Sequence, residues 1–340
     1  MQIGFLSLGD VLPDPMTGHL PTDGARTRAI VDAAVHAEEL GFDLVQLGEH
    51  HGSAYQLSAP PVVLAAIAAR TDRILLSTGV TLAANLDPVR MAEDYATLDC
   101  VSGGRAEIVA GRGSYFARTF DYLGQDPARS RELFDEHVEL LLRLLADGPV
   151  DHPGGVRAPL VDFTARPRPD GRVPVWVGGG TSAETPRFAA RHGLPLMLPS
   201  VFAGPRMFVP IVASYRAAWE EAGHTGPARI GAVAHCHVGA TPAAARTGFE
   251  PHYEQYWSWV QDLIADYTPH ARRLPFDFDA MLVGPAVCGS AAEVVDRIGH
   301  WRAVLDLDRF SFMFDLGGMA VGSVRAAMER FAADVAPQVR

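Results

Sequence analysis

The feature that most constrains this fold is the regular alternation of short apolar segments with helical patterns along the chain. Strands that alternate with helices at this spacing form parallel βαβ units. Eight such repeats predict an α/β fold of the (β/α)8 TIM-barrel type. The apolar segments have the pattern of strands buried on both faces of a sheet, and they occupy residues 3–8, 43–47, 74–82, 105–110, 173–177, 194–198, 229–238 and 310–314.

The helices between these strands have recognisable starts and stops. Thr22 precedes a helical pattern that Gly41 ends, and Pro88 begins another that ends at Gly103 and Gly104, in keeping with the positional preferences of these residue types. A doubly wound sheet is the alternative architecture. It would need a glycine-rich phosphate loop directly after the first strand, and residues 9–13 do not form one.

The length of 340 residues suits one barrel domain, so we expect residues 1–340 to form a single unit. The segment at about 242–288 is too long for an ordinary barrel connection and reads as an inserted helical lid or side wall. The Pro- and Gly-rich residues 148–172 predict an irregular excursion or a small hairpin. The inserted segment carries an aromatic group, namely Tyr253, Tyr256, Trp257 and Trp259.

Composition limits the possible partners and location. The formal net charge of −11 argues against nucleic acid or an anionic membrane as partner, because both need clustered basic residues. Cys100, Cys236 and Cys288 are far apart and have no CxxC spacing, so neither a disulfide framework nor a thiolate zinc site is predicted. With no basic leader and no apolar run that could span a bilayer, we expect a cytoplasmic protein.

The run Glu49-His50-His51 follows the second predicted strand, and a barrel keeps its chemistry at the carboxyl ends of its strands. An imidazole beside a carboxylate can titrate near neutral pH and serve as a general acid or base. We therefore take His50 and Glu49 as candidate catalytic residues. A solvated polar loop is the alternative interpretation.

Two further histidines, His235 and His237, lie on the seventh predicted strand with side chains on the same face. They could hold a metal, but polar lining of the barrel or buried histidines with satisfied hydrogen bonds fit the pattern better. We expect no metal site.

Two loops have the features of an anion site. Gly111-Arg112-Gly113 follows the fourth predicted strand and presents a guanidinium that nothing crowds. The residues 178–182, Gly-Gly-Gly-Thr-Ser, follow the fifth predicted strand and precede a helix expected over 181–192, so backbone N–H groups and hydroxyls converge there. A tight turn with a helix cap explains either loop alone, whereas both on one barrel face favour a phosphate ligand.

The chain resembles the bacterial luciferase-like flavin-dependent monooxygenases. Several segments carry this resemblance in the family's order, through most of the chain: Gly41-Phe42-Asp43 leading to Glu49-His50-His51, then residues 68–74 (AARTDRI), 87–93 (DPVRMAE), 98–105 (LDCVSGGR), 111–113 (GRG), 174–180 (PVWVGGG) and 331–337 (FAADVAP).

The resemblance implies a TIM barrel that binds reduced FMN at its mouth and oxidises a small organic substrate with O2 through a flavin C4a-peroxide. It assigns His50 to the family's active-site histidine, Arg112 to its phosphate-binding arginine, and Gly179, Gly180, Thr181 and Ser182 to the loop that completes the phosphate site. Gly79-Val80 matches a position where the family can carry a non-proline cis peptide under the flavin ring. At Gly111 the light-emitting members have a cysteine, so peroxide lifetime is not implied.

The resemblance also implies partners. We expect a transient flavin reductase and a homodimer, with His51 and Glu93 near the subunit contact. Glu49 would tune or orient His50, and Tyr115 and Phe116 would join the aromatic insertion in the pocket wall. The first alternative is a deazaflavin (F420)-dependent hydride-transfer oxidoreductase on the same barrel. The second is a flavin-binding protein without turnover.

Overall fold

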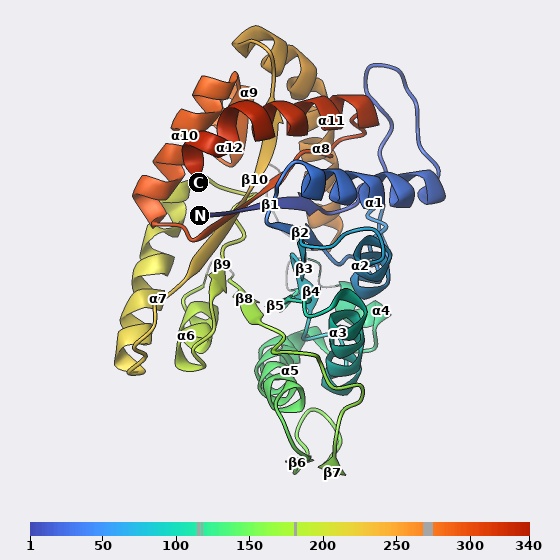
Figure 1. The fold of residues 1–340 in the computed structure, drawn as a ribbon, viewed down its shortest axis with the longest axis vertical. Coiled ribbons are helices and arrows are strands. Elements are labelled where there is room, and N and C mark those ends of the chain that lie inside the picture. Colours follow the sequence, from blue (N-terminus) through green and yellow to red (C-terminus); the bar gives the residue numbers. More distant parts are fainter. Residues whose placement is uncertain (114–115, 117, 180–181, 268–274) are drawn as a thin grey trace.

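The computed structural model describes residues 1–113, 116, 118–179, 182–267 and 275–340. Its central element is a mostly parallel sheet that curves into a barrel (Figure 1). Among the described residues the strands of this sheet are β1 (Gln2–Ser7), β2 (Leu44–Leu47), β3 (Leu75–Thr78), β4 (Thr81–Leu82), β5 (Ile108–Gly111), β8 (Val175–Gly178), β9 (Leu196–Met197), β10 (Ile230–Val238), β11 (Ala286–Gly289) and β12 (Arg309–Met313).

The strand order closes the barrel. The path of paired strands runs β3-β2-β1-β12-β10-β9-β8-β5-β4, with β11 attached to β10. Its two ends, β3 and β4, are consecutive in the chain and are separated by Gly79 and Val80 alone. A bridge between Leu76 and Ala106 also joins β3 to the segment before β5. The predicted α/β barrel is therefore confirmed.

Helices cover the outside of the barrel (Figure 1). Their ends follow local sequence rules: the Thr22 side chain accepts from the Ala25 N–H at the first helix, and Gly103, at φ 68°, ends the third. The helices are α1 (Asp23–Glu39), α2 (Pro60–Ala68), α3 (Pro88–Ser102), α4 (Arg118–Tyr122), α5 (Ser130–Leu145), α6 (Glu184–Arg191), α7 (Val209–Glu221), α8 (Pro242–Tyr267), α9 (Phe278–Val283), α10 (Ala291–Leu305), α11 (Val321–Arg330) and α12 (Ala336–Val339).

Several expected boundaries differ from the observed ones. The strand expected over 74–82 is divided into β3 and β4, and the strand β11 lies inside the segment expected to be an inserted wall. The helix expected from 181 begins at Glu184, and the helix expected over 205–222 begins with a 3-10 turn, Pro205–Phe208, before α7. The hairpin expected within 148–172 is present as β6 (Val150–His152) and β7 (Leu160–Phe163), which project from the barrel (Figure 1).

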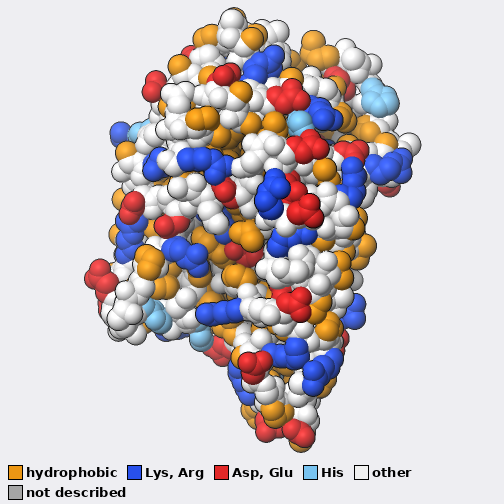
Figure 2. Space-filling model, in the orientation of Figure 1, with side chains coloured by type: hydrophobic (Ala, Val, Ile, Leu, Met, Phe, Trp, Pro, Cys, Tyr) orange, Lys and Arg blue, Asp and Glu red, His pale blue; other side chains and the backbone are white. Residues whose placement is uncertain are grey.

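The surface agrees with the charge analysis. On the face shown in Figure 2, acidic and basic side chains are interspersed, and that face has no large basic patch. No helix in the described part of the chain is both long and apolar enough to cross a membrane.

A buried ion pair crosses the barrel interior near the amino ends of the strands. Arg309, the first residue of β12, places Nη2 2.9 Å from Glu107 Oε2. The same carboxylate accepts from Ser77 Oγ at 2.7 Å and from Trp176 Nε1 at 2.9 Å. The guanidinium also donates to Gln2 Oε1 and lies 4.1 Å from the centre of the Trp176 ring. Side chains from several strands thus meet in one polar cluster.

Removing the cation of this cluster should destabilise the barrel strongly. Arg309→Met leaves Glu107 as an uncompensated buried charge, so we expect the free energy of unfolding to fall by about 3–5 kcal/mol. Arg90→Ala is the control, because the exposed Arg90–Asp94 pair should contribute no more than about 1 kcal/mol. Urea unfolding followed by circular dichroism measures both. Equal losses in the two variants would contradict the assignment.

Candidate active site

A cavity opens where the carboxyl ends of the barrel strands converge. It has room for the centres of water molecules over about 180 Å³, and its lining is mostly apolar. The strand ends contribute Gly79, Val80, Gly111 and Gly178, and the helix α8 covers another side. Several predicted site residues from distant parts of the sequence therefore meet here.

His50 lies in the wall of this cavity. Its ring stacks on Tyr55 with the centroids 4.0 Å apart. The Phe116 ring lies in a T-shaped arrangement with it, with the centroids 5.4 Å apart. The backbone N–H of His50 donates to Leu57 O at 3.0 Å, which holds the loop after β2. The ring atom Nδ1 is buried and has no hydrogen-bond partner. His50 thus has one ring nitrogen without a partner in otherwise aromatic surroundings.

Glu49 does not orient His50, contrary to expectation. Its Oε1 lies 2.8 Å from His51 Nε2, and its Oε2 accepts from the backbone N–H of Leu82 at 2.9 Å. Glu49 is buried and touches the cavity, but its hydrogen bonds tie the β2 loop to β4. His51 is therefore paired with a carboxylate of its own chain, and the Glu93 carboxylate lies 4.0 Å from Arg90.

The environment of His50 also changes its expected protonation. Burial of the ring lowers its pKa from the ordinary 6.5 to about 3, because a charged imidazolium would lose its hydration there. The expectation of titration near neutral pH is therefore wrong. At neutral pH His50 is an uncharged imidazole.

The wall formed by β4, β5 and β8 depends on glycine. The Gly79–Val80 peptide bond is cis, which confirms the geometry expected there. A Cβ atom on Gly111 would lie 2.3 Å from a methyl group of Val80, and one on Gly178 would lie 2.7 Å from the other methyl. Both glycines are thus required by the position of the Val80 side chain, and the wall exposes backbone rather than bulky side chains.

The predicted anion site is only partly assembled from the expected residues. Arg112 and Gly179 line the cavity, whereas Gly180, Thr181 and Tyr115 lie outside the described residues. Ser182 is exposed and does not reach the cavity. The residue at the N-cap of α6 is Ala183, which makes no side-chain cap, so the expected hydroxyl cap is absent at this end of the helix.

Sequence reasoning missed a second guanidinium beside this loop. Thr185, in the first turn of α6, lines the cavity and accepts from Arg131 Nη1 at 3.2 Å. Arg131 also pairs with Asp135. These residues are 54 positions apart in the chain, and no local pattern linked them. Arg131 thus reaches the cavity wall through the Thr185 hydroxyl.

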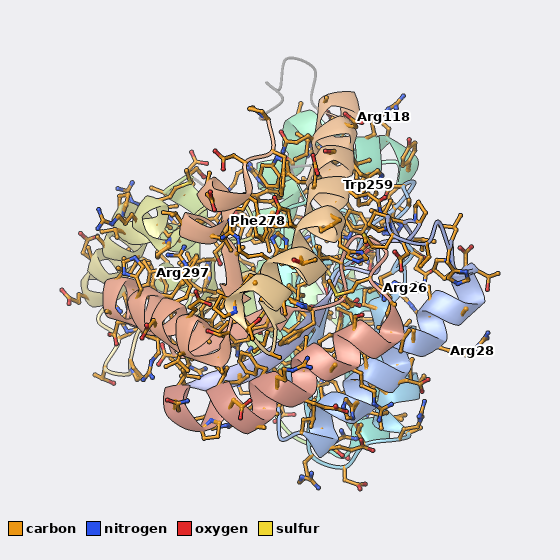
Figure 3. The ribbon with its side chains drawn as sticks, turned by 90° about the horizontal axis from the view of Figure 1, so that it is seen from above. Arg26, Arg28, Arg118, Trp259, Phe278 and Arg297 are labelled. Atoms are coloured by element: carbon orange, nitrogen blue, oxygen red, sulfur yellow. The ribbon has the colours of Figure 1, made fainter. Side chains whose placement is uncertain are left out.

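The aromatic segment expected to form a wall does so. Tyr256 and Trp257 of α8 line the cavity, and Trp259, labelled in Figure 3, packs edge-on against Tyr55 at 4.6 Å. The hydroxyls of Tyr55 and Tyr256 are 2.8 Å apart. This hydrogen bond joins the β2 loop to α8, so the wall beside His50 is one continuous aromatic layer.

The two histidines of β10 have different surroundings. His235 lines the cavity, while His237 stacks on Phe249 at 5.5 Å and does not reach the cavity. Burial lowers the pKa of His235 to about 3 and that of His237 to about 4. Within the described residues, no group of three or more His, Cys, Asp or Glu side chains could hold a metal ion.

The low pKa of His50 predicts a loss of stability on acidification. The folded pKa lies below the unfolded one, so the unfolded chain takes up the proton first, and the stabilisation present above about pH 6.5 is lost toward about pH 3. When the pH is lowered from 7.5 to 5, the free energy of unfolding falls in both proteins. The fall should be about 2 kcal/mol smaller in His50→Gln than in the wild type. Urea unfolding at both pH values measures this. His19→Gln, at an exposed site, should behave like the wild type; if H50Q does too, His50 is not buried as a neutral ring.

Known proteins resemble this chain in sequence and in fold. The flavin-dependent trigonelline monooxygenase, oxygenase component, of Acinetobacter baylyi is 24% identical over 88% of this chain and 86% of the relative. The crystal structure of the monooxygenase RslO1 from Streptomyces bottropensis superimposes with a TM-score of 0.87 at 26% identity, over the whole of both chains.

Two more distant structures share the fold and differ in their ligands. The oxygenating constituent of 3,6-diketocamphane monooxygenase from Pseudomonas putida, in complex with FMN, has a TM-score of 0.82 at 18% identity and covers 100% of this chain and 99% of its own. An F420-dependent secondary alcohol dehydrogenase has a TM-score of 0.75 at 19% identity, with the same coverage. The model of the luciferase-like monooxygenases matches residues 1–306. The chain belongs to the luciferase-like monooxygenase family.

Proposed function

We propose that this protein is the oxygenase component of a two-component monooxygenase. It takes reduced FMN from a separate flavin reductase and uses O2 to oxidise a small organic substrate. The observation that carries the proposal is the apolar cavity at the carboxyl ends of the strands, with a glycine-rich wall, an unpartnered imidazole atom at His50 and a guanidinium at Arg112. The oxygenase relative in Acinetobacter supports the division of labour with a reductase.

The residues of the cavity fit a flavin. The wall around Val80 offers backbone and methyl groups to a flat ring system, because Gly111 and Gly178 carry no side chains. Arg112 would hold the phosphate beside Gly179, a described residue of the glycine loop that lines the cavity, and a planar guanidinium suits a phosphate well. Reduced flavin, when bound, supplies the electrons that activate dioxygen.

The chain's own contribution is exclusion of water and one positioned imidazole. The aromatic layer of Tyr55, Phe116 and Tyr256 would shield the reacting atoms from solvent, which suppresses side reactions. His50 stays neutral and would act at Nδ1, where it holds or accepts a proton of the bound molecules through a hydrogen bond. Glu49 serves indirectly, by fixing the loop that carries His50.

The deazaflavin alternative rests on a specific finding, since an F420-dependent dehydrogenase shares this fold. It predicts hydride transfer without dioxygen. A flavin-binding protein without turnover is the other alternative, and it predicts tight binding of oxidised flavin with no consumption of FMNH2. The two experiments below separate all three.

The wild type should bind FMNH2 more tightly than reduced deazaflavin under anaerobic conditions. Arg112→Ala should weaken FMNH2 binding at least about tenfold, because it removes a charge-assisted contact to the phosphate. Arg28→Ala is the matched control, since Arg28 is exposed on α1 (Figure 3) and should leave binding unchanged. Anaerobic fluorescence titration gives the dissociation constants. Tighter binding of reduced deazaflavin would favour the alternative.

His50→Ala should separate binding from chemistry. FMNH2 binding should stay within about threefold of the wild type, whereas flavin-dependent oxygen transfer should fall about 10²-fold or more. Labelled dioxygen and mass spectrometry of products from a substrate panel measure the transfer, and the same titration measures binding. An equal loss of both would show that His50 has a structural role only.

A further inference from the structure

A second imidazole in the cavity has a polar atom with no partner. His235 is 2% exposed, lies on β10 and lines the cavity. Its Nδ1 lies 2.9 Å from the hydroxyl of Tyr253 on α8, and its Nε2 is buried with no hydrogen-bond partner. A buried polar atom without a partner is unfavourable, because it has lost its hydration and gained no hydrogen bond. Because Tyr253 occupies Nδ1, Nε2 is the ring nitrogen left without a partner in a residue that lines the cavity.

The Tyr253 contact decides which ring nitrogen carries the proton. Tyr253 is fully buried, and burial raises its pKa well above 10, so the phenol keeps its hydrogen. Among the described residues its hydroxyl has one hydrogen-bond partner, His235. If the phenol donates to Nδ1, the hydroxyl and Nδ1 are both satisfied, and the imidazole hydrogen lies on Nε2, the nitrogen without a partner. The opposite tautomer would leave a buried O–H without an acceptor, which is unfavourable.

The surroundings of His235 are otherwise apolar. Val233 lies on the same face of β10, the Tyr256 ring is edge-on at 5.4 Å, and Trp257 and Val260 of α8 complete this part of the wall. The result is an apolar wall that contains the unpartnered ring nitrogen of His235. Such a wall favours a ligand that carries an acceptor atom on an apolar body.

We propose that His235 binds the substrate through Nε2–H, and that the substrate is a largely apolar molecule with a carbonyl or phenolic oxygen that accepts this hydrogen bond. This inference rests on the proposed function, since it assigns the substrate side of the same cavity. Tyr253 is a positioning residue in this arrangement, because it acts on the substrate only through the tautomer of His235.

The tautomer is tested without any ligand. In ¹⁵N-histidine-labelled protein, His235 should show a protonated Nε2 and an unprotonated Nδ1, with the signal assigned by its absence in His235→Gln. In Tyr253→Phe the preference should be lost, because the phenol hydrogen no longer occupies Nδ1. A protonated Nδ1 in the wild type would overturn the proposal.

The substrate class is tested with a matched pair of probes, 2-acetylnaphthalene and 2-ethylnaphthalene, which differ in the acceptor oxygen. The wild type should bind the ketone about fivefold more tightly than the hydrocarbon, because one hydrogen bond contributes about 1 kcal/mol. His235→Phe should lose this preference, and His235→Gln should keep most of it, because its side-chain amide also donates. Quenching of tryptophan fluorescence measures the affinities, and circular dichroism checks that each variant is folded.

The outcomes separate this inference from the proposed function. No preference in the wild type, failure to bind the ketone, or a preference that survives in H235F would overturn the inference, whatever the flavin affinity. If H235F weakens FMNH2 binding as much as ketone binding, the N–H serves the flavin and the inference is also wrong. A ketone preference that depends on His235 in a protein that does not bind FMNH2 would leave the inference standing and overturn the proposed function.

Discussion

The barrel depends on the buried contact between Glu107 and Arg309. Two charges in a protein interior are costly unless their hydrogen bonds are complete. Here the carboxylate receives Arg309, Ser77 and Trp176, and the guanidinium also reaches Gln2. These side chains come from strands on different sides of the barrel, so the cluster fixes their relative positions near the amino ends and leaves the opposite end free to form a cavity.

The two ends of the barrel treat polar groups in opposite ways. Near the amino ends, the buried carboxylate of Glu107 is fully bonded. Near the carboxyl ends, His50 Nδ1 and His235 Nε2 are buried without partners. Such atoms lower the stability of the folded state, because each loses its hydration and gains no hydrogen bond. Other buried polar atoms also lack partners, Trp301 Nε1 and Ser311 Oγ among them, but among the described residues His50 and His235 are the two that line the cavity, where a ligand would satisfy them.

The sequence predicted the barrel well because its signal is periodic and repeated. It missed what periodicity does not encode. Ser77, Thr78 and Gly79 interrupt the apolar pattern of residues 74–82, but a polar residue or a glycine is common within a strand, so the pattern did not show that the strand divides there, and only the family resemblance indicated a cis bond. The strand β11 is short, follows the long α8, and is defined by its pairing with His235 to Val238, a tertiary contact that no local pattern reports.

The sequence placed His50, Gly79, Gly111, Arg112 and Gly179 near one another, and all of them line the cavity, but it did not predict the protonation of His50. In an extended segment, residues two apart share a side, so Glu49 pairs with His51 while His50 faces the cavity. The neighbouring carboxylate suggested a neutral-pH imidazole, yet burial by residues distant in sequence lowers its pKa. The glycine wall comes from strand ends, whereas Tyr253, Tyr256 and Trp257 come from α8. Substitutions in α8 would therefore change the aromatic side of the cavity and leave the glycine wall intact, so the two sides of this cavity can vary independently on one barrel.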